Sequence, residues 1–282
     1  MKYCLFIFSL FVAFGLSAGE LKSHCEVDAA KVSDIVRNLK ESDSSLGDRL
    51  VYAAKTLEGS PEDDYYKVDS IAELRINLDS NSPLMFLNNV IALAKASLQP
   101  SGEEVNTFSS QLVDVACRRG ENNGFPSVMY HISDWIIDNA TRGNLREMTE
   151  DYEGVVARTK SLDEMTRNRS NFAALSNPDV FEAVRMMEMG FRTHRIPSLK
   201  KETIKKKEII DDLQNGDIII LVPNRDGIDY YDLGFIEMEN GKPFLIHVSP
   251  QTHVVTKEKE DLQHYMNLMT KHFQGYRILR VK

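Results

Sequence analysis

Ser82, Asp232 and His247 carry the three types of side chain found in a serine-hydrolase triad. Such a triad needs a hydroxyl that attacks, an imidazole that accepts its proton and a carboxylate that orients the imidazole. Pro83 follows Ser82, however, and a serine before a proline is a common start to an α-helix, where the hydroxyl accepts a backbone hydrogen bond. We therefore predict that Ser82 caps a helix rather than attacks a substrate.

A cysteine thiol is the second candidate nucleophile. Cys117 precedes Arg118 and Arg119, and nearby positive charge lowers a thiol pKa and favours the reactive thiolate. In an oxidising compartment Cys117 could instead pair with Cys25, if their Cα atoms come within about 7 Å. The sequence favours a structural role for Cys117 over a catalytic one and leaves the pairing open.

Asp232, His247 and His253 are candidate metal ligands, because residues six apart on a strand lie on the same face. Their spacing matches none of the familiar ligand patterns, and scattered histidines are more often surface residues or hydrogen-bonded core residues. We therefore predict no metal and no other cofactor.

Asp232 and His247 belong to a β-rich region over about 214–282. Its runs of strand-forming residues are GDIIILV, YYDLGFIEME, KPFLIHVS and GYRILRVK, and the intervening ENGK is a hairpin signal. Asp232 lies in the second run and His247 in the third. A helix is predicted between the last two runs, over about 257–273.

Ser82 and Pro83 precede a predicted helix over about 84–98 that is apolar on nearly every side. Such a helix belongs at the centre of a protein. Ser101 and Glu104 have the spacing of a capping box, which predicts the start of the next helix. Other helices are predicted within 27–57 and over 176–190, and a short strand over 71–79.

The order of these elements, helices first and an antiparallel sheet last, indicates an α+β protein with its central helix packed on the sheet. Residues 1–18 have the lysine, apolar run and small residues of a secretory signal peptide. We expect one domain over 19–282, with a helical part over about 26–213 and a β-rich part over about 214–282.

Export follows from this N-terminal segment. Its apolar run is shorter than the roughly 18 residues that a membrane-spanning helix needs, so we predict cleavage and no transmembrane segment afterwards. The mature protein would be periplasmic or extracellular. The formal net charge of −8 argues against a nucleic-acid partner, because phosphates bind basic surfaces.

Three blocks of sequence resemble the N-acetylmuramoyl-L-alanine amidase-like branch of the NlpC-type, papain-like cell-wall cysteine amidases. MFLNNVIALAKAS resembles the helix after that family's Asp-Cys-Thr-Thr-Phe-Val-Glu motif. GFPSVMYHISDWIIDNATRG resembles its Ser-Arg-x-His-Tyr-Phe-x-Asp-Trp-Ile block, and residues 216–249 resemble its Gly-Asp-Ile-Ile, His-Val-Gly and Leu-His-Ala-Ser motifs. The resemblance covers about residues 47–282. It implies a papain-like fold in which a Cys at a helix N-terminus is activated by a His on a neighbouring strand.

The resemblance also places substitutions at the catalytic positions. Pro83 stands where the family has its nucleophilic Cys, and Asp232 stands where it has its catalytic His. His247 matches the orienting member of the triad. Proline has no nucleophile, and a carboxylate would raise rather than lower the pKa of a nearby thiol. We expect a catalytically degenerate member of the family.

An inactive member can retain the groove in which the family binds small peptidoglycan fragments. The resemblance thus implies an exported, non-catalytic protein that binds a muropeptide, a peptide or a secreted protein partner. Two alternatives stay open: an active amidase that uses a rearranged site, and a structural or interaction module without a ligand. We interpret Trp135 as a core residue. The candidate ligand-binding residues are Ser82, Tyr130, His131, Asp134, Tyr231 and His247.

Overall fold

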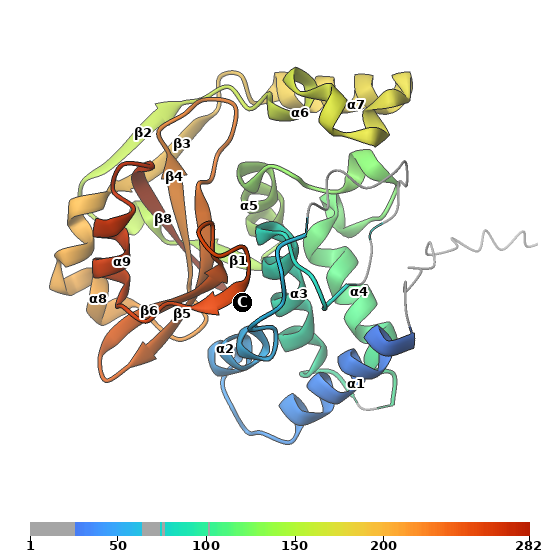
Figure 1. The fold of residues 1–282 in the computed structure, drawn as a ribbon, viewed down its shortest axis with the longest axis vertical. Helices are drawn as coiled ribbons and strands as arrows, with labels where there is room; N and C mark the ends of the chain where they lie inside the picture. The colour runs from blue at the N-terminus through green and yellow to red at the C-terminus, as the bar shows by residue number, and fades with distance from the viewer. Residues whose placement is uncertain (1–25, 64–73, 75–76, 101) are drawn as a thin grey trace, which may run out of the picture.

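The computed structural model describes residues 26–63, 74, 77–100 and 102–282. The predicted signal peptide, Cys25, Ser101 and most of the predicted strand over 71–79 lie outside these residues, and the described residues 77–79 are not in a strand. A layer of helices packs beside an antiparallel sheet (Figure 1), which confirms the predicted α+β class.

Within the described residues, eight strands form one sheet in which all pairs are antiparallel. The strand order is β2-β3-β8-β4-β5-β6-β7, and β1 also pairs with β8. The strands are β1 (Leu145–Glu147), β2 (Val155–Thr159), β3 (Arg195–Lys200), β4 (Ile218–Pro223), β5 (Asp232–Glu239), β6 (Lys242–Val248), β7 (Val255–Lys257) and β8 (Phe273–Val281).

Strand β4 is buried on both faces of the sheet, and its successive side chains point to opposite faces. In β4, Ile218 and Ile220 pack with the helical layer, whereas Ile219 and Leu221 pack on the opposite face. That second face is covered by α8 (Lys207–Asp212) and α9 (Leu262–Leu268). The apolar residues of β4 therefore contact two separate cores.

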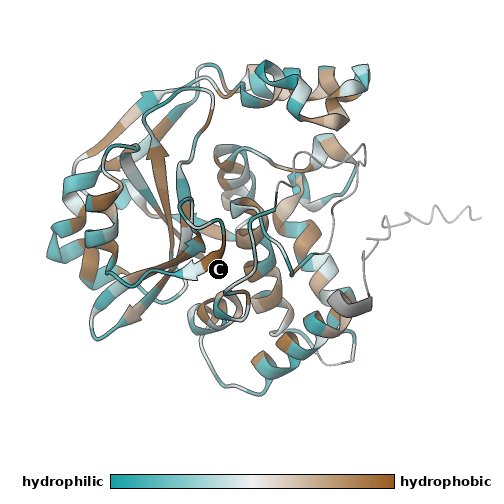
Figure 2. Ribbon diagram, in the orientation of Figure 1, coloured by the Kyte–Doolittle hydropathy of each residue, from teal (hydrophilic) through white to brown (hydrophobic). Residues whose placement is uncertain are grey.

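The helical layer surrounds α3. This helix packs against α1, α2, α4 and strands β5 and β6, and twelve of its fourteen residues are buried. Figure 2 shows the helix coloured mainly as hydrophobic, so the predicted central helix is confirmed. The helices of this layer are α1 (Glu26–Lys40), α2 (Leu46–Thr56), α3 (Pro83–Ala96), α4 (Glu104–Ala116) and α5 (Ile132–Thr141).

Several boundaries differ from prediction. The helix predicted over 257–273 is the shorter α9, because Asp261 accepts a hydrogen bond from the His264 N–H and starts the helix there. The predicted capping box puts Ser101 before the helix, but α4 starts at Glu104 and Glu103 occupies the capping position. The predicted ENGK hairpin is confirmed: Asn240 and Gly241 both have positive φ between β5 and β6.

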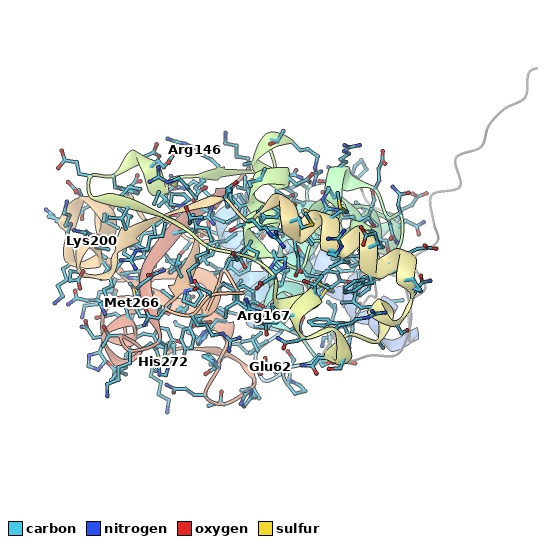
Figure 3. The ribbon with its side chains drawn as sticks, turned by 90° about the horizontal axis from the view of Figure 1, so that it is seen from above. Glu62, Arg146, Arg167, Lys200, Met266 and His272 are labelled. Atoms are coloured by element: carbon cyan, nitrogen blue, oxygen red, sulfur yellow. The ribbon has the colours of Figure 1, made fainter. Side chains whose placement is uncertain are left out.

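Strands β1, β2 and β3 come from the part of the chain predicted to be helical, over 26–213. Strand β2 lacks clear apolar alternation because it is a half-exposed edge strand of the sheet. Between β2 and β3 the chain forms α6 (Glu164–Arg167) and α7 (Pro178–Gly190). Viewed from above, α6, marked by Arg167, and α7 lie over the helical layer (Figure 3).

No helix in the described part of the chain has the length and apolar character needed to span a bilayer.

Candidate functional site

A cavity of about 340 Å³ lies where the N-terminus of α3 meets the start of β5. Its walls also come from the segment before α5, the loop between β4 and β5, and the region around α6. Its lining residues are Glu62, Asp63, Ser82, Pro83, Tyr130, His131, Glu164, Met165, Phe172, Arg225, Ile228, Asp229, Tyr230, Tyr231, Asp232, Val248 and Pro250.

Ser82 caps α3, as predicted. Its backbone is extended, and its hydroxyl accepts a hydrogen bond from the Met85 N–H at 3.4 Å. Pro83 occupies the first helical position, where its missing N–H leaves no intrahelical hydrogen bond unmade. Both residues line the cavity, so the helix terminus presents a proline ring and a capping hydroxyl to it.

His247 is fully buried and lies between two carboxylates. Its Nδ1 is 2.8 and 2.9 Å from the two oxygens of Asp232, and its Nε2 is 2.9 Å from Oε1 of Glu258. Burial alone would lower the pKa of His247, but the charge of Asp232 and hydrogen bonds to both carboxylates raise it to about 9. His247 is therefore an imidazolium at neutral pH, and both ring nitrogens donate.

Asp232 is the centre of a buried network on β5. Besides His247, it accepts hydrogen bonds from the Tyr265 hydroxyl at 2.5 Å and from the Leu233 N–H at 2.8 Å. The ring of Tyr265 meets that of His247 edge-on, with centroids 5.2 Å apart. The Asp232 carboxylate also contributes to the cavity wall.

His131, another lining residue, forms a second buried ion pair. Its Nε2 is 3.0 Å from Oε1 of Glu188 on α7. Burial would lower the pKa of His131, but the hydrogen bond to Glu188 and the charge of Asp229 raise it. Glu188 also accepts from the N–H groups of Met165 and Thr166 at 3.0 and 3.2 Å. This pair links α7 and α6 to the residue before α5.

Asp229 caps α5, although it is distant from this helix in the sequence. The helix starts after His131, whose side chain makes no capping hydrogen bond. Asp229, in the loop before β5, accepts instead from the N–H groups of Ile132 at 3.3 Å and Ser133 at 2.6 Å. The carboxylate is 1% exposed and fixes the cavity loop to the helix.

The structure brings together most of the residues that the sequence identifies. Ser82, Pro83, Tyr130, His131, Tyr231 and Asp232 all line the cavity. The other two candidates, His247 and Asp134, are not among the lining residues. His247 instead contacts Asp232, and Asp134 forms an ion pair with Arg118 at 2.5 Å. Trp135 is a core residue, as predicted: it is 0% exposed and donates to Asn88 at 2.8 Å.

Of the three candidate metal ligands, Asp232 and His247 are in contact, but they form no metal site with His253 within the described residues. No group of three or more His, Cys, Asp or Glu side chains there has the arrangement of a metal site. His253, one of the three candidates, instead contacts Glu62 through its Nδ1.

A family model described as AmiA-like, N-acetylmuramoyl-L-alanine amidase-like, matches residues 45–272. The chain belongs to this amidase-like family.

Solved structures share its fold. An N-acetylmuramoyl-L-alanine amidase from Bacteroides uniformis is 23% identical with a TM-score of 0.72, over 85% of this chain and 100% of that one. A putative xylanase from Bacteroides fragilis is 26% identical with a TM-score of 0.70, over 81% and 99% of the two chains. A protein from Legionella pneumophila is 15% identical with a TM-score of 0.66, over 90% and 96%. Comparison with curated proteins finds no match.

Cys117 is a buried free thiol in this amidase-like protein. Burial raises its pKa to about 11, and this effect exceeds the opposing influence of Ser127, Arg142 and Arg118. The thiol is therefore protonated at neutral pH, in agreement with the predicted structural role.

Sequence reasoning missed several residues of the amidase-like cavity. Glu164, Met165 and Phe172 line it from the segment around α6, which the sequence presents only as polar loop. Asp229 and Arg225 come from the turn between β4 and β5. One signal was available for Asp229: the helix starting at Ile132 has no Ser, Thr, Asp or Asn before it, so another residue must satisfy its first amides.

Proposed function

We propose that this amidase-like protein is exported, does not hydrolyse an amide bond, and binds a peptidoglycan fragment in the cavity beside Pro83 and Asp232. The observation that carries the proposal is His247, held as an imidazolium between Asp232 and Glu258 while the cavity in front of Asp232 stays open. The scaffold of the site is present, but its reactive groups are replaced.

The arrangement of α3 against β5 and β6 supports an NlpC-type, papain-like scaffold. In that scaffold the nucleophile lies at the N-terminus of the central helix, and the imidazole lies on an adjacent strand. Here the corresponding positions are Pro83 and Asp232, which line the same cavity. Their convergence supports the alignment of the two positions with the catalytic pair.

The chemistry of these side chains opposes hydrolysis. Proline cannot attack a carbonyl, and the Asp232 carboxylate is committed to His247 and Tyr265. A serine-based reaction at Ser82 would need an imidazole nitrogen able to accept the hydroxyl proton. Both nitrogens of His247 instead contact carboxylates, and the Ser82 hydroxyl caps α3.

The same cavity is suited to binding. Its volume lies within the range of about 300–1,000 Å³ typical of small-molecule sites. Tyr130, Phe172, Tyr230 and Tyr231 give it aromatic walls, and several carboxylates and the Arg225 guanidinium line it beside them. Aromatic faces with nearby polar groups favour ligands that combine sugar rings with peptide.

Two measurements on the purified protein test the proposal. Calorimetry with a muropeptide should detect binding that Tyr231→Ala weakens, since Tyr231 lines the cavity. Incubation with the same muropeptide should release no peptide. Peptide release that is abolished by His247→Ala would establish hydrolysis and reject the non-catalytic proposal. A lack of detectable heat at high ligand concentration would reject the binding proposal and favour an interaction module without a small ligand.

A further inference from the structure

Arg225 has a position in the cavity that is distinct from that of the other charged lining residues. His131 is paired with Glu188, Asp232 with His247, and Glu62 with His253. The Arg225 side chain is 68% exposed, and its ion pair within the described residues is with Glu164 at 3.7 Å. That separation is too long for a hydrogen bond, so the guanidinium donors are not committed to this carboxylate.

The backbone that carries Arg225 is held firmly although its side chain is exposed. The buried Lys160 ammonium donates to the carbonyl oxygens of Pro223 and Arg225, each at 2.6 Å. The Gly227 N–H donates to the Ser161 carbonyl at 3.1 Å, and the left-handed φ of +94° at Gly227 permits this turn. These contacts thus hold the loop at Pro223, at Arg225 and at Gly227.

We propose that Arg225 binds a carboxylate of the ligand and that Lys160 is the positioning residue that presents it. A guanidinium presents a planar fork of N–H donors that matches a carboxylate in two parallel hydrogen bonds. The occupant of the cavity is then a peptide-bearing molecule with a free carboxylate. This inference rests on the proposed function, because it names the part of a muropeptide that the cavity recognises.

Glu164 offers a second test, in which the affinity for an acidic ligand should rise rather than fall. Its carboxylate is 3.7 Å from the Arg225 guanidinium and would compete with the ligand for it. Removing that negative charge should therefore strengthen binding of an acidic ligand, whereas removing the Arg225 charge should weaken it. A gain in affinity cannot result from misfolding.

The experiment compares three probes by calorimetry on the purified full chain. They are N-acetyl-L-alanyl-D-glutamate, its diamide, and N-acetylmuramoyl-L-alanyl-D-glutamate. We expect the diacid to bind about three- to tenfold more tightly than the diamide, a range that allows for solvent screening of the exposed Arg225. Arg225→Gln should abolish this ratio, and Glu164→Gln should increase it. Arg167→Gln, on α6 but not among the lining residues, should leave it unchanged.

Lys160→Met should reduce the diacid-to-diamide ratio toward that of Arg225→Gln, without changing diamide affinity. Equal binding of diacid and diamide by the wild type, or an unchanged ratio in Arg225→Gln, would overturn the inference. If the diacid binds by Arg225 but the muramoyl probe binds no better, the sugar part of the proposed function fails and carboxylate recognition stands. If no probe binds, both proposals are wrong.

Discussion

His247 shows how two neighbouring carboxylates set the charge of a buried imidazole. Its pKa is raised to about 9, above the ordinary value of 6.5, because the charge of Asp232 and hydrogen bonds to Asp232 and Glu258 outweigh burial. A group whose folded-state pKa is raised binds its proton more tightly in the folded state. That stability is fully present below about pH 6.5 and is lost as the pH rises through 9.

We therefore expect the free energy of unfolding to fall by about 3 kcal/mol between pH 6.5 and pH 9.5 because of His247. Denaturant titrations at several pH values measure this slope. In His247→Gln the slope should be smaller by that amount, which separates His247 from other titrating groups such as His131. A variant with the same pH slope as the wild type would show that His247 is not held as an imidazolium.

Asp229 shows that a helix cap need not come from the local sequence. At the level of the element, it stabilises α5 by accepting from the Ile132 and Ser133 amides, and it holds the loop before β5 against that helix. Asp229→Ala should lower the free energy of unfolding by about 1–3 kcal/mol, because two buried donors lose their acceptor. Thermal or denaturant unfolding measures the loss.

Asp226 in the same loop supplies the matched control. Its side chain is exposed, so Asp226→Ala should leave stability within about 0.5 kcal/mol of the wild type. Asp229→Asn should fall between the wild type and Asp229→Ala, since the amide keeps one oxygen acceptor. Equal stability of all three variants would contradict a capping role for Asp229.

Elements with a strong local signal were predictable from the sequence. The apolar run after Ser82 and Pro83 gave α3 at the centre, and Asn240-Gly241 gave the hairpin between β5 and β6. Edge strand β2 was not predictable, because its residues are half exposed and do not alternate. The extent of α9 was missed because Asp261 sets its start, inside a polar stretch that also suits a helix.

In the candidate site, the sequence predicted single residues whose side-chain type suggests a role, but not the contacts between them. Ser82, Tyr130, His131, Tyr231 and Asp232 reach the cavity as expected. The contacts that shape it join residues far apart in the sequence, such as His131 to Glu188 and Lys160 to the loop between β4 and β5. No periodicity or local motif reports such pairs, because they depend on how whole segments pack.

At the scale of the whole molecule, Glu188 joins the α6–α7 segment, residues 160–194, to the helical layer. It is 3% exposed and receives hydrogen bonds from His131, from two amides at the start of α6 and from the Thr166 hydroxyl. Met165 and Phe172 of this segment line the cavity. The shape of the cavity therefore depends on this junction as well as on α3 and β5.

Glu188→Ala should loosen the α6–α7 segment while the sheet and α3 keep their packing, because it leaves His131 and two amides without their acceptor. Hydrogen exchange should accelerate by about tenfold or more within residues 160–194 and change little in β4, β5 and β8. Glu182→Ala, on the exposed side of α7 where Glu182 pairs with Arg185, should leave exchange unchanged. Faster exchange throughout the sheet would instead mean that the segment and the core unfold as one unit, and that Glu188 contributes to global stability rather than to the cavity wall alone.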